Sequence, residues 1–217
     1  MKVIAVNGGP RKSWNTATLL NRAIDGAKSV GAETEFFHLY DLNFKGCTSC
    51  FSCKRKGNAS NGVCAMKDGL SACLDEISKC DVLLLGSPIY IGGITGVMHS
   101  FLERLLFAPL VYDADYSSIF PGRVASCFFY TLGAPEERAK AQNYQAIFQS
   151  NDMGLKRLKG ASEHLVSYNT YQFDDYAKYD APAFDEKAKA KHKAEHFPEE
   201  CRKAFDIGAR LAQAANE

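Results

Sequence analysis

Short apolar runs alternate with amphipathic segments along most of this sequence. The run Val82-Leu83-Leu84-Leu85, which stops at Gly86-Ser87-Pro88, is the clearest example and is typical of a strand buried on both faces. Strands are predicted at residues 2–6, 33–39, 82–85, 123–130 and 163–168. Helices are predicted between them, at residues 13–29, 68–77, 95–106 and 136–151. This alternation predicts an α/β fold built on a doubly wound parallel sheet.

The composition limits the class of function. The chain has 217 residues, of which 46% are hydrophobic, and this is enough for one globular domain with a small appendage. Its 26 Lys and Arg and 25 Asp and Glu give a formal net charge of +1, which supports neither a nucleic-acid nor an anionic-membrane partner. No apolar run approaches the roughly eighteen residues of a membrane span, and the opening run is too short for a signal peptide. We therefore expect a cytoplasmic protein whose thiols stay reduced.

The composition changes near residue 172. Residues 1–172 contain all the predicted strands and form the predicted globular domain. Residues 173–217 are rich in Ala, Lys, Asp and Glu and predict a charged helical C-terminal extension, with a last helix over about 198–215. The stretch 187–196 is so highly charged that a solvated helix face is favoured over a basic binding patch.

The loop after the first strand, residues 7–16, has the features of an anion site. Free backbone N–H groups at a helix start, together with the positive end of the helix dipole, favour a phosphate. The loop matches neither a Walker A motif nor a G-x-G-x-x-G fingerprint, which disfavours ATP and a Rossmann-bound dinucleotide. A loop with ordinary helix capping is the alternative. The predicted phosphate contacts are Arg11, Ser13, Asn15 and Thr16.

Two further loops follow the third and fourth strands and lie at the same edge of the sheet, where open α/β sheets bind ligands. The first offers a flat, apolar surface for a ring, and a glycine in the second lets the backbone approach a ligand closely. The predicted binding residues are Ser87, Pro88, Ile89, Tyr90 and Gly92 in the first loop and Thr131 and Gly133 in the second. One loop suited to a phosphate and one suited to a ring together imply a phosphorylated planar cofactor, which in this topology is FMN.

Three cysteines at two-residue gaps and a fourth ten residues later form a possible metal site: Cys47, Cys50, Cys53 and Cys64. Thiolates spaced in this way can converge on one centre, and a [4Fe–4S] cluster, a zinc ion, a redox disulfide and plain thiols all remain open. The polar insertion 57–63 would loop out and let Cys64 reach the other three. Because the cysteines follow the second strand, we expect them close to the cofactor loops. Cys73, Cys80 and Cys127 lie on apolar faces and are predicted to be core residues.

Three motifs carry a family resemblance. They are Gly8-Gly9-Pro10-Arg11 with Asn15-Thr16, Gly46-Cys47 with Cys50 and Cys53, and Gly86-Ser87-Pro88-Ile89-Tyr90. In this order, over about residues 1–170, they resemble the NAD(P)H-dependent FMN reductase superfamily, and within it the iron–sulfur flavoprotein branch and its cluster-free relatives. The resemblance implies a flavodoxin-like, five-stranded parallel sheet in the order 2-1-3-4-5, an FMN-binding domain at residues 1–172, and a homodimer or homotetramer.

The resemblance also implies roles for residues. Arg11, Ser13, Asn15 and Thr16 would hold the FMN phosphate, Pro88, Ile89, Tyr90 and Gly92 would line the isoalloxazine, Thr131 and Gly133 would close its other side, and Cys47, Cys50, Cys53 and Cys64 would match cluster ligands. The sequence departs from the family pattern at Gly9, where relatives commonly have serine, at His99, where lysine is frequent, and in the ten-residue gap before Cys64.

These features favour an FMN-dependent oxidoreductase that passes electrons from NAD(P)H through the flavin to a quinone, a flavin or a protein. An iron–sulfur flavoprotein that carries electrons to and from ferredoxin-like partners is the alternative. A zinc-stapled binding protein without redox activity is a third possibility. Hydride transfer to a flavin requires the protein to position the ring and not to supply an acid or base, so no catalytic side chain is predicted.

Overall fold

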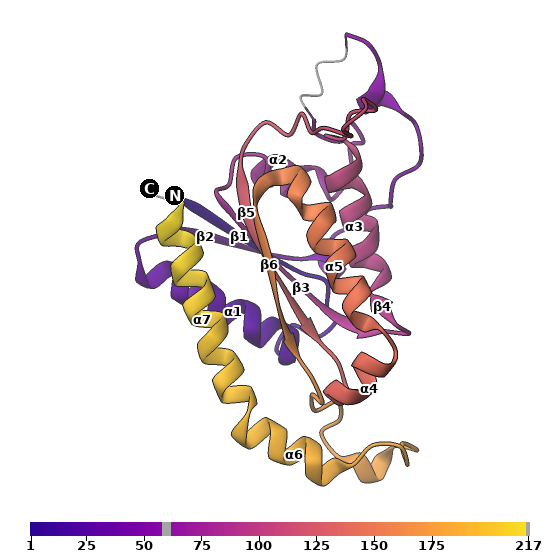
Figure 1. Ribbon diagram of the computed structural model, residues 1–217, viewed down its shortest axis with the longest axis vertical. Coiled ribbons are helices and arrows are strands. Elements are labelled where there is room, and N and C mark those ends of the chain that lie inside the picture. Colours follow the sequence, from indigo (N-terminus) through magenta and orange to yellow (C-terminus); the bar gives the residue numbers. More distant parts are fainter. Residues whose placement is uncertain (58–61, 216–217) are drawn as a thin grey trace.

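The computed structural model describes residues 1–57 and 62–215. One twisted sheet lies between two layers of helices, and the C-terminal helices continue beyond one end of the sheet (Figure 1). Residues 58–61, which belong to the insertion expected to loop out before Cys64, lie outside the described residues.

The sheet has six strands. Five are parallel, in the order β2-β1-β3-β5-β6, and a sixth, β4, pairs antiparallel with the end of β3. The parallel strands are β1 (Lys2–Asn7), β2 (Glu33–His38), β3 (Val82–Tyr90), β5 (Val124–Thr131) and β6 (Lys159–Ser167). The predicted α/β class with a parallel sheet is confirmed, but the prediction of five strands in the order 2-1-3-4-5 is wrong. It omitted β4 (Gly93–Ile94), because a two-residue strand has no periodicity that a sequence could reveal.

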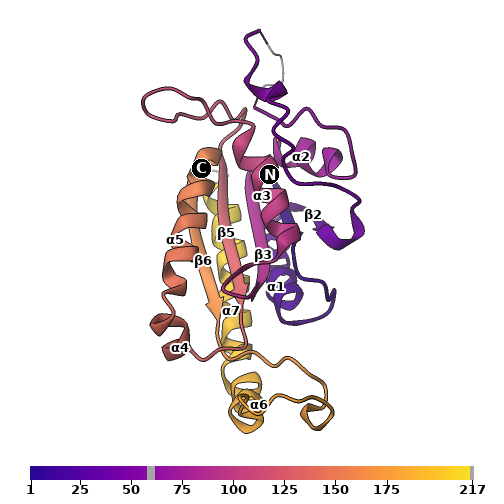
Figure 2. The same ribbon diagram turned by 90° about the vertical axis from the view of Figure 1, so that its right-hand side faces the viewer.

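The helices cover both faces of the sheet, as the parallel pairing requires (Figure 2). In β1, Val3 and Ala5 pack in the cluster with α1 (Asn15–Ser29) and α7 (Phe197–Ala214). The alternate residues Ile4 and Val6 pack in the cluster with α2 (Ser71–Ile77), α3 (Gly96–Phe107) and α5 (Tyr144–Leu155). Since strand side chains point alternately to opposite faces, a continuous apolar run provides both of these cores.

The predicted helix over residues 136–151 is two helices, α4 (Glu136–Ala141) and α5. The break lies at Asn143, whose φ of 55° is in the left-handed region that ends helical geometry. Asparagine tolerates this conformation better than most residues, and the sequence contains no Pro or Gly there to announce the break. The break turns the chain beside the end of β5, where one of the predicted binding loops lies.

The C-terminal extension contains α6 (Glu186–Glu195) and α7, which follow each other almost directly. α7 packs along α1 through two glycines, because a Cβ on Gly208 would lie 1.9 Å from the carbonyl oxygen of Ala23, and a Cβ on Gly26 would lie 1.9 Å from that of Phe205. α6 lies near the carboxyl ends of the strands and is mainly exposed, as the charged stretch predicts. Lys189 is an exception to this prediction, since only 1% of it is exposed.

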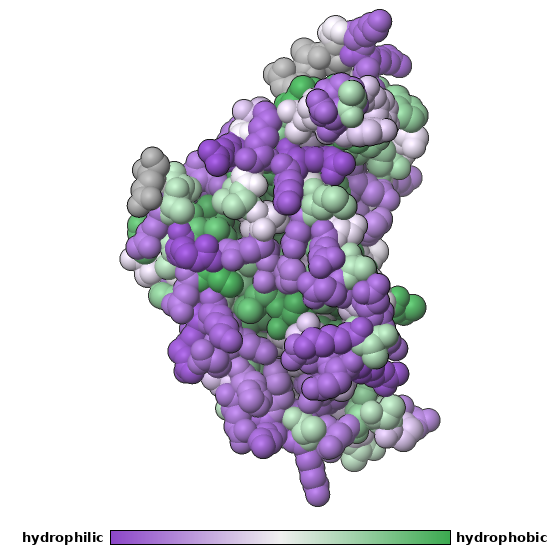
Figure 3. Space-filling view, viewed as in Figure 1, coloured by the Kyte–Doolittle hydropathy of each residue, from purple (hydrophilic) through white to green (hydrophobic). Residues whose placement is uncertain are grey.

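The surface agrees with a globular fold whose last strand lies at an edge. The face seen in Figure 3 is largely hydrophilic, with a hydrophobic strip near the middle, where β6 lies. Among residues 1–57 and 62–215, no helix combines the length and apolar character that a membrane span requires.

Candidate functional site

The carboxyl ends of β3 and β5 and the loops that follow β1, β5 and β6 meet at one edge of the sheet and enclose a hollow of about 40 Å³. The predicted cofactor-binding residues that line this hollow are Arg11, Asn15, Thr16, Pro88, Ile89, Tyr90, Thr131 and Gly133. Ser13, Ser87 and Gly92 do not line it. The tertiary structure therefore brings the three predicted loops together, and their contacts with FMN stay a prediction.

The start of α1 leaves backbone donors for an anion. Trp14 is the N-cap residue, and its side chain makes no capping hydrogen bond. None of the side chains of Ser13, Asn15 and Thr16 therefore occupies the N-cap position. Because the first N–H groups of a helix have no partners within the helix, an uncapped start that lines a hollow is suited to bind phosphate.

The side-chain donors of the first loop contact the segment that follows β6. Arg11 Nη1 donates to the carbonyl oxygen of Gln172 at 2.7 Å, and Asn15 Nδ2 donates to that of Tyr171 at 2.8 Å. Trp14 Nε1 also donates to the Tyr171 oxygen, at 3.0 Å. Two of the four predicted phosphate contacts thus also fasten residues 171–172 over the loop.

Ser87, in the last part of β3, and Gly92, in the turn that follows it, shape this side of the site. Ser87 Oγ accepts a hydrogen bond from the Thr95 N–H at 3.0 Å and donates to the carbonyl oxygen of Pro88 at 2.8 Å. Ile91 and Gly92, at the turn between β3 and β4, both have positive φ, 50° and 74°. A β-branched residue at positive φ is strained, and such strain concentrates at ligand-binding loops. This turn holds Tyr90 at the rim of the hollow.

Gln172 is a site residue that the sequence analysis missed. Its Oε1 atom is buried and has no hydrogen-bond partner among the described residues. The side chain lies so close to Gly133 that a Cβ on this glycine would be 2.7 Å from Oε1. A buried acceptor without a donor is costly, so Oε1 is suited to accept a hydrogen bond from a ligand.

A larger hollow of about 570 Å³ adjoins the first. Ile89, Leu132, Gly133 and Gln172 line both hollows, so they are contiguous. The far wall, at the start of α6, consists of Ala183, Phe184, Asp185, Ala188 and Lys189. The volume of this larger hollow is within the range of roughly 300–1,000 Å³ that small-molecule and cofactor sites occupy. One hollow thus offers an anion site and the other offers space for a ring.

The four cysteines of the predicted metal site line one small hollow of about 20 Å³ between their loop and the end of α3. None of the eight cysteines, all within the described ranges, forms a disulfide. Among the described residues, no group of three or more His, Cys, Asp or Glu side chains is placed to hold a metal ion. Cys73, Cys80 and Cys127 are buried, as predicted, and burial raises the pKa of Cys80 to about 12.

The cysteine loop is far from the cofactor loops within one chain, and the expectation that the two lie close together is wrong. At the start of α3, Thr95 Oγ1 donates to the carbonyl oxygen of Gly8 at 2.7 Å. Near its end, the Cys47 N–H donates to Glu103 Oε2 at 2.9 Å. Thr95 and Glu103 are eight residues apart, which along a helix is a rise of about 12 Å. The chain runs back from the end of β2 to the other end of the sheet before the cysteines begin (Figure 1).

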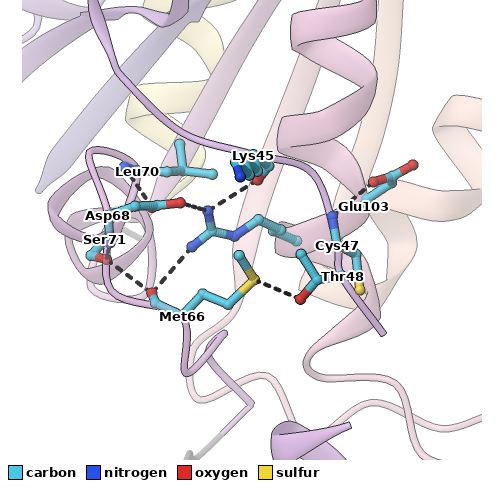
Figure 4. A network of polar contacts seen from close by, with 9 residues as sticks. Lys45, Cys47, Thr48, Met66, Asp68, Leu70, Ser71 and Glu103 are labelled. Carbon is cyan, nitrogen blue, oxygen red and sulfur yellow. Dashed lines mark hydrogen bonds and ion pairs between the residues drawn. The ribbon is translucent and has the colours of Figure 1, made fainter. Parts of the chain in front are cut away.

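Arg104 closes the cysteine loop at its base. Its guanidinium donates to the carbonyl oxygens of Lys45 and Met66, both at 3.2 Å, and pairs with Asp68 Oδ2 at 2.5 Å. Lys45 and Met66 flank the loop on either side, and Figure 4 shows their carbonyl groups and the Asp68 carboxylate converging on this group. The Nε atom of Arg104 is buried without a hydrogen-bond partner among the described residues.

Positive charge surrounds the sulfur atoms. Burial lowers the pKa of Arg104, but the hydrogen bond to Asp68 and the proximity of Cys64 outweigh burial and raise it, so this group stays charged beside Cys64. Lys54 Nζ donates to the carbonyl oxygen of Ala108 at 3.1 Å and also interacts electrostatically with Cys53. Thiolates or a negatively charged cluster would be stabilised by these cations.

Comparison with known proteins agrees with this geometry. A family model described as NADPH-dependent FMN reductase matches residues 1–154. An iron-sulfur flavoprotein of Archaeoglobus fulgidus is 34% identical over 104 residues, which are 48% of this chain and 48% of that protein. The chain therefore spans about half the length of the curated relatives that it matches.

Solved structures share the fold. An NAD(P)H:quinone oxidoreductase from Methanothermobacter marburgensis has a TM-score of 0.71 at 13% identity, over 97% of this chain and 98% of that chain. A flavodoxin from the domain Archaea has a TM-score of 0.51 at 12% identity, over 100% of both chains. At these identities the likeness concerns the fold alone, which is flavodoxin-like.

Proposed function

Because the chain belongs to the NADPH-dependent FMN reductase family, we propose that it is an FMN-dependent oxidoreductase. In this proposal it transfers electrons from NAD(P)H through the flavin to a quinone, a flavin or a protein acceptor. The observation that carries the proposal is the pair of contiguous hollows at the carboxyl edge of the sheet, one at the uncapped start of α1 and one large enough for a ring. The predicted family resemblance is confirmed.

The residues present fit FMN. The N–H groups at the start of α1 are suited to the phosphate, and the apolar residues 88–90 offer a surface for the ring. The unpaired Oε1 of Gln172 would accept a hydrogen bond from the cofactor. FMN, when bound, accepts a hydride from a reduced nicotinamide and passes the electrons on. The chain's own work is to bind and orient the ring and to limit the access of water.

Removal of the Arg11 guanidinium tests the phosphate site. In Arg11→Ala, the dissociation constant of FMN should rise about tenfold, the equivalent of one charge-assisted hydrogen bond at an exposed site. Quenching of FMN fluorescence on titration with protein measures this constant. Lys12→Ala is the matched control, because Lys12 pairs with Asp41 and does not line the hollow. Equal affinities in the two variants would remove Arg11 from the phosphate site, and no FMN binding by the wild type would overturn the proposed function.

A second candidate function rests on the cysteine loop. We propose that Cys47, Cys50, Cys53 and Cys64 hold a [4Fe–4S] cluster and that the protein exchanges electrons with a ferredoxin-like partner. All four side chains line one hollow, although they are not gathered for a single ion. A [4Fe–4S] cluster takes four cysteine thiolates, which is the number that line this hollow, whereas tetrahedral zinc would need its thiolates about 2.3 Å from a single ion. The cluster would supply one-electron transfer, and the buried Arg104 Nε would offer it or its ligands a donor.

Removal of one thiolate tests whether the cysteine site and the FMN site are independent of each other. In Cys50→Ala, reconstituted anaerobically, iron and acid-labile sulfide should fall from about four per chain to less than one. FMN content should stay the same, because the cofactor loops lie at the other end of α3. Cys201→Ala, which alters a cysteine on α7 away from the loop, should keep its iron. Zinc in place of iron, or the same metal content in Cys50→Ala, would contradict the cluster. The cytoplasmic location and the homodimer or homotetramer stay predictions.

A further inference from the structure

Lys189 is a buried ammonium group on an otherwise exposed helix. It belongs to α6, in the C-terminal extension, and only 1% of it is accessible to solvent. Its Nζ donates to the carbonyl oxygen of Gly133 at 2.5 Å, to Asn169 Oδ1 at 3.0 Å and to the carbonyl oxygen of Thr170 at 3.4 Å. All three acceptors come from the loops that follow β5 and β6. One lysine of the extension thus fastens two loops of the candidate flavin site.

The charge of Lys189 has no anionic partner among the described residues. Its three acceptors are neutral, and none of the ion pairs within residues 1–57 and 62–215 includes it. The carboxylate of Asp185, which lines the same hollow, accepts the capping hydrogen bond of the Ala188 N–H at 3.0 Å. Burial lowers the pKa of Lys189 to about 8. A buried cation without a counter-charge is costly, which indicates that something other than stability accounts for its position.

The position of Lys189 connects this charge with the candidate cofactor. The side chain lines the larger hollow, and its partner Gly133 lines both hollows. Phe184, whose ring lies 4.8 Å from Nζ, lines the same wall. Among the described residues, Lys189 is the one lysine whose side chain is buried. It lies where a ring would fit.

We propose that Lys189 is a positioning and potential-setting residue of the flavin site, contributed by the C-terminal extension. The inference rests on the proposed function, because it requires bound FMN. Two-electron reduction adds electron density to the flavin, so a nearby cation stabilises the reduced form more than the oxidised form. Through its bond to Gly133, Lys189 also holds the loop that closes the site. The extension is then a part of the redox centre and not only a surface appendage.

The test compares Lys189→Met with Lys187→Met. Methionine keeps the length of the side chain without its charge, and Lys187 is an exposed residue on the same helix whose side chain makes no hydrogen bond or ion pair with the described residues. The dissociation constants of oxidised and reduced FMN and the midpoint potential of the bound flavin are measured for both variants and the wild type. In Lys189→Met, the preference for reduced over oxidised FMN should fall about tenfold, which lowers the two-electron potential by about 30 mV. Lys187→Met should equal the wild type.

The outcomes separate this inference from the proposed function. An unchanged potential in Lys189→Met with weaker binding of both flavin forms would overturn the electrostatic role and leave a structural one. An unchanged potential with unchanged affinities would overturn the inference completely. No FMN binding by the wild type would reject the proposed function as well. If Lys189→Met is too unstable to purify, Lys189→Gln provides the same measurement, since its shorter neutral side chain keeps a hydrogen-bond donor.

Discussion

Arg104→Met is expected to destabilise the protein by about 3 kcal/mol and to abolish iron binding at the cysteine loop. The Arg104 side chain is completely buried, and its loss leaves the carboxylate of Asp68 without its partner. In the same substitution the Lys45 carbonyl loses its bond from Arg104 and the Met66 carbonyl keeps only its bond from Ser71 Oγ, so Arg104 no longer joins the two ends of the cysteine loop. Urea denaturation measures the stability, and iron and sulfide analysis after reconstitution measures the cluster. FMN affinity should stay within twofold of the wild type.

The pH dependence of this loss of stability would identify the ion pair between Arg104 and Asp68 as its cause. Burial raises the pKa of Asp68, but hydrogen bonds from Arg104 and from the Leu70 N–H outweigh burial and hold the pKa below its usual value. A lowered carboxyl pKa contributes stability above the unfolded pKa of about 4, and this contribution is lost as the pH falls through the folded pKa. The difference between wild type and Arg104→Met should therefore be full at pH 7 and shrink below pH 4. Arg123→Met, at an exposed position, is the control, and an Arg104→Met protein as stable as this control would contradict the prediction.

Gly208→Ala is expected to destabilise the protein by about 3 kcal/mol, at the upper end of the range for an overpacked core. A Cβ at this position would lie 1.9 Å from the carbonyl oxygen of Ala23, and backbone cannot move aside as a side chain can. α7 would have to separate from α1 along their whole contact. Alanine is a better helix former than glycine by about 1 kcal/mol. A loss of stability would therefore show that the steric overlap with Ala23 outweighs the gain in helix propensity. Thermal and urea denaturation measure the change.

Gly96→Ala is the matched control for this substitution. Gly96 is also helical, at the start of α3, but nothing lies within 4 Å of a Cβ placed there. We expect its stability to be equal to or slightly above that of the wild type. A loss of the same size in both variants would mean that the cost arises from the substitution of a helical glycine and not from the contact between α1 and α7.

The strands were predictable because their apolar runs are buried on both faces, and such runs are plain in a sequence. β3 and β5 lie within three residues of the predicted positions at their amino ends. β4 was not predictable, because it exists only through its pairing with β3 after a strained turn at Ile91. The break between α4 and α5 was missed for a similar reason, since Asn143 carries a left-handed conformation that its residue type permits but does not require.

Most of the candidate cofactor site could be predicted, because parallel strands bring their carboxyl ends to one edge whatever the sequence of the loops. Gln172 was missed although a signal existed, since it follows the last strand, whose loop must reach the same edge. Lys189 had no such signal. In a helix with a lysine at almost every second position, the sequence does not show which one turns inward.

The amino-acid sequence by itself determined the α/β class, the loops at the carboxyl edge, the cluster of four cysteines and the family, because each depends on local pattern or on spacing along the chain. The tertiary structure alone decided the distances between these parts. It placed the cofactor loops at the start of α3 and the cysteine loop near its end, fastened both ends of that loop to Arg104 and directed Lys189 of the extension toward the candidate flavin site. These results depend on contacts between residues 19 to 87 positions apart, such as Thr95 with Gly8, Arg104 with Lys45 and Lys189 with Thr170, and no local pattern encodes such contacts.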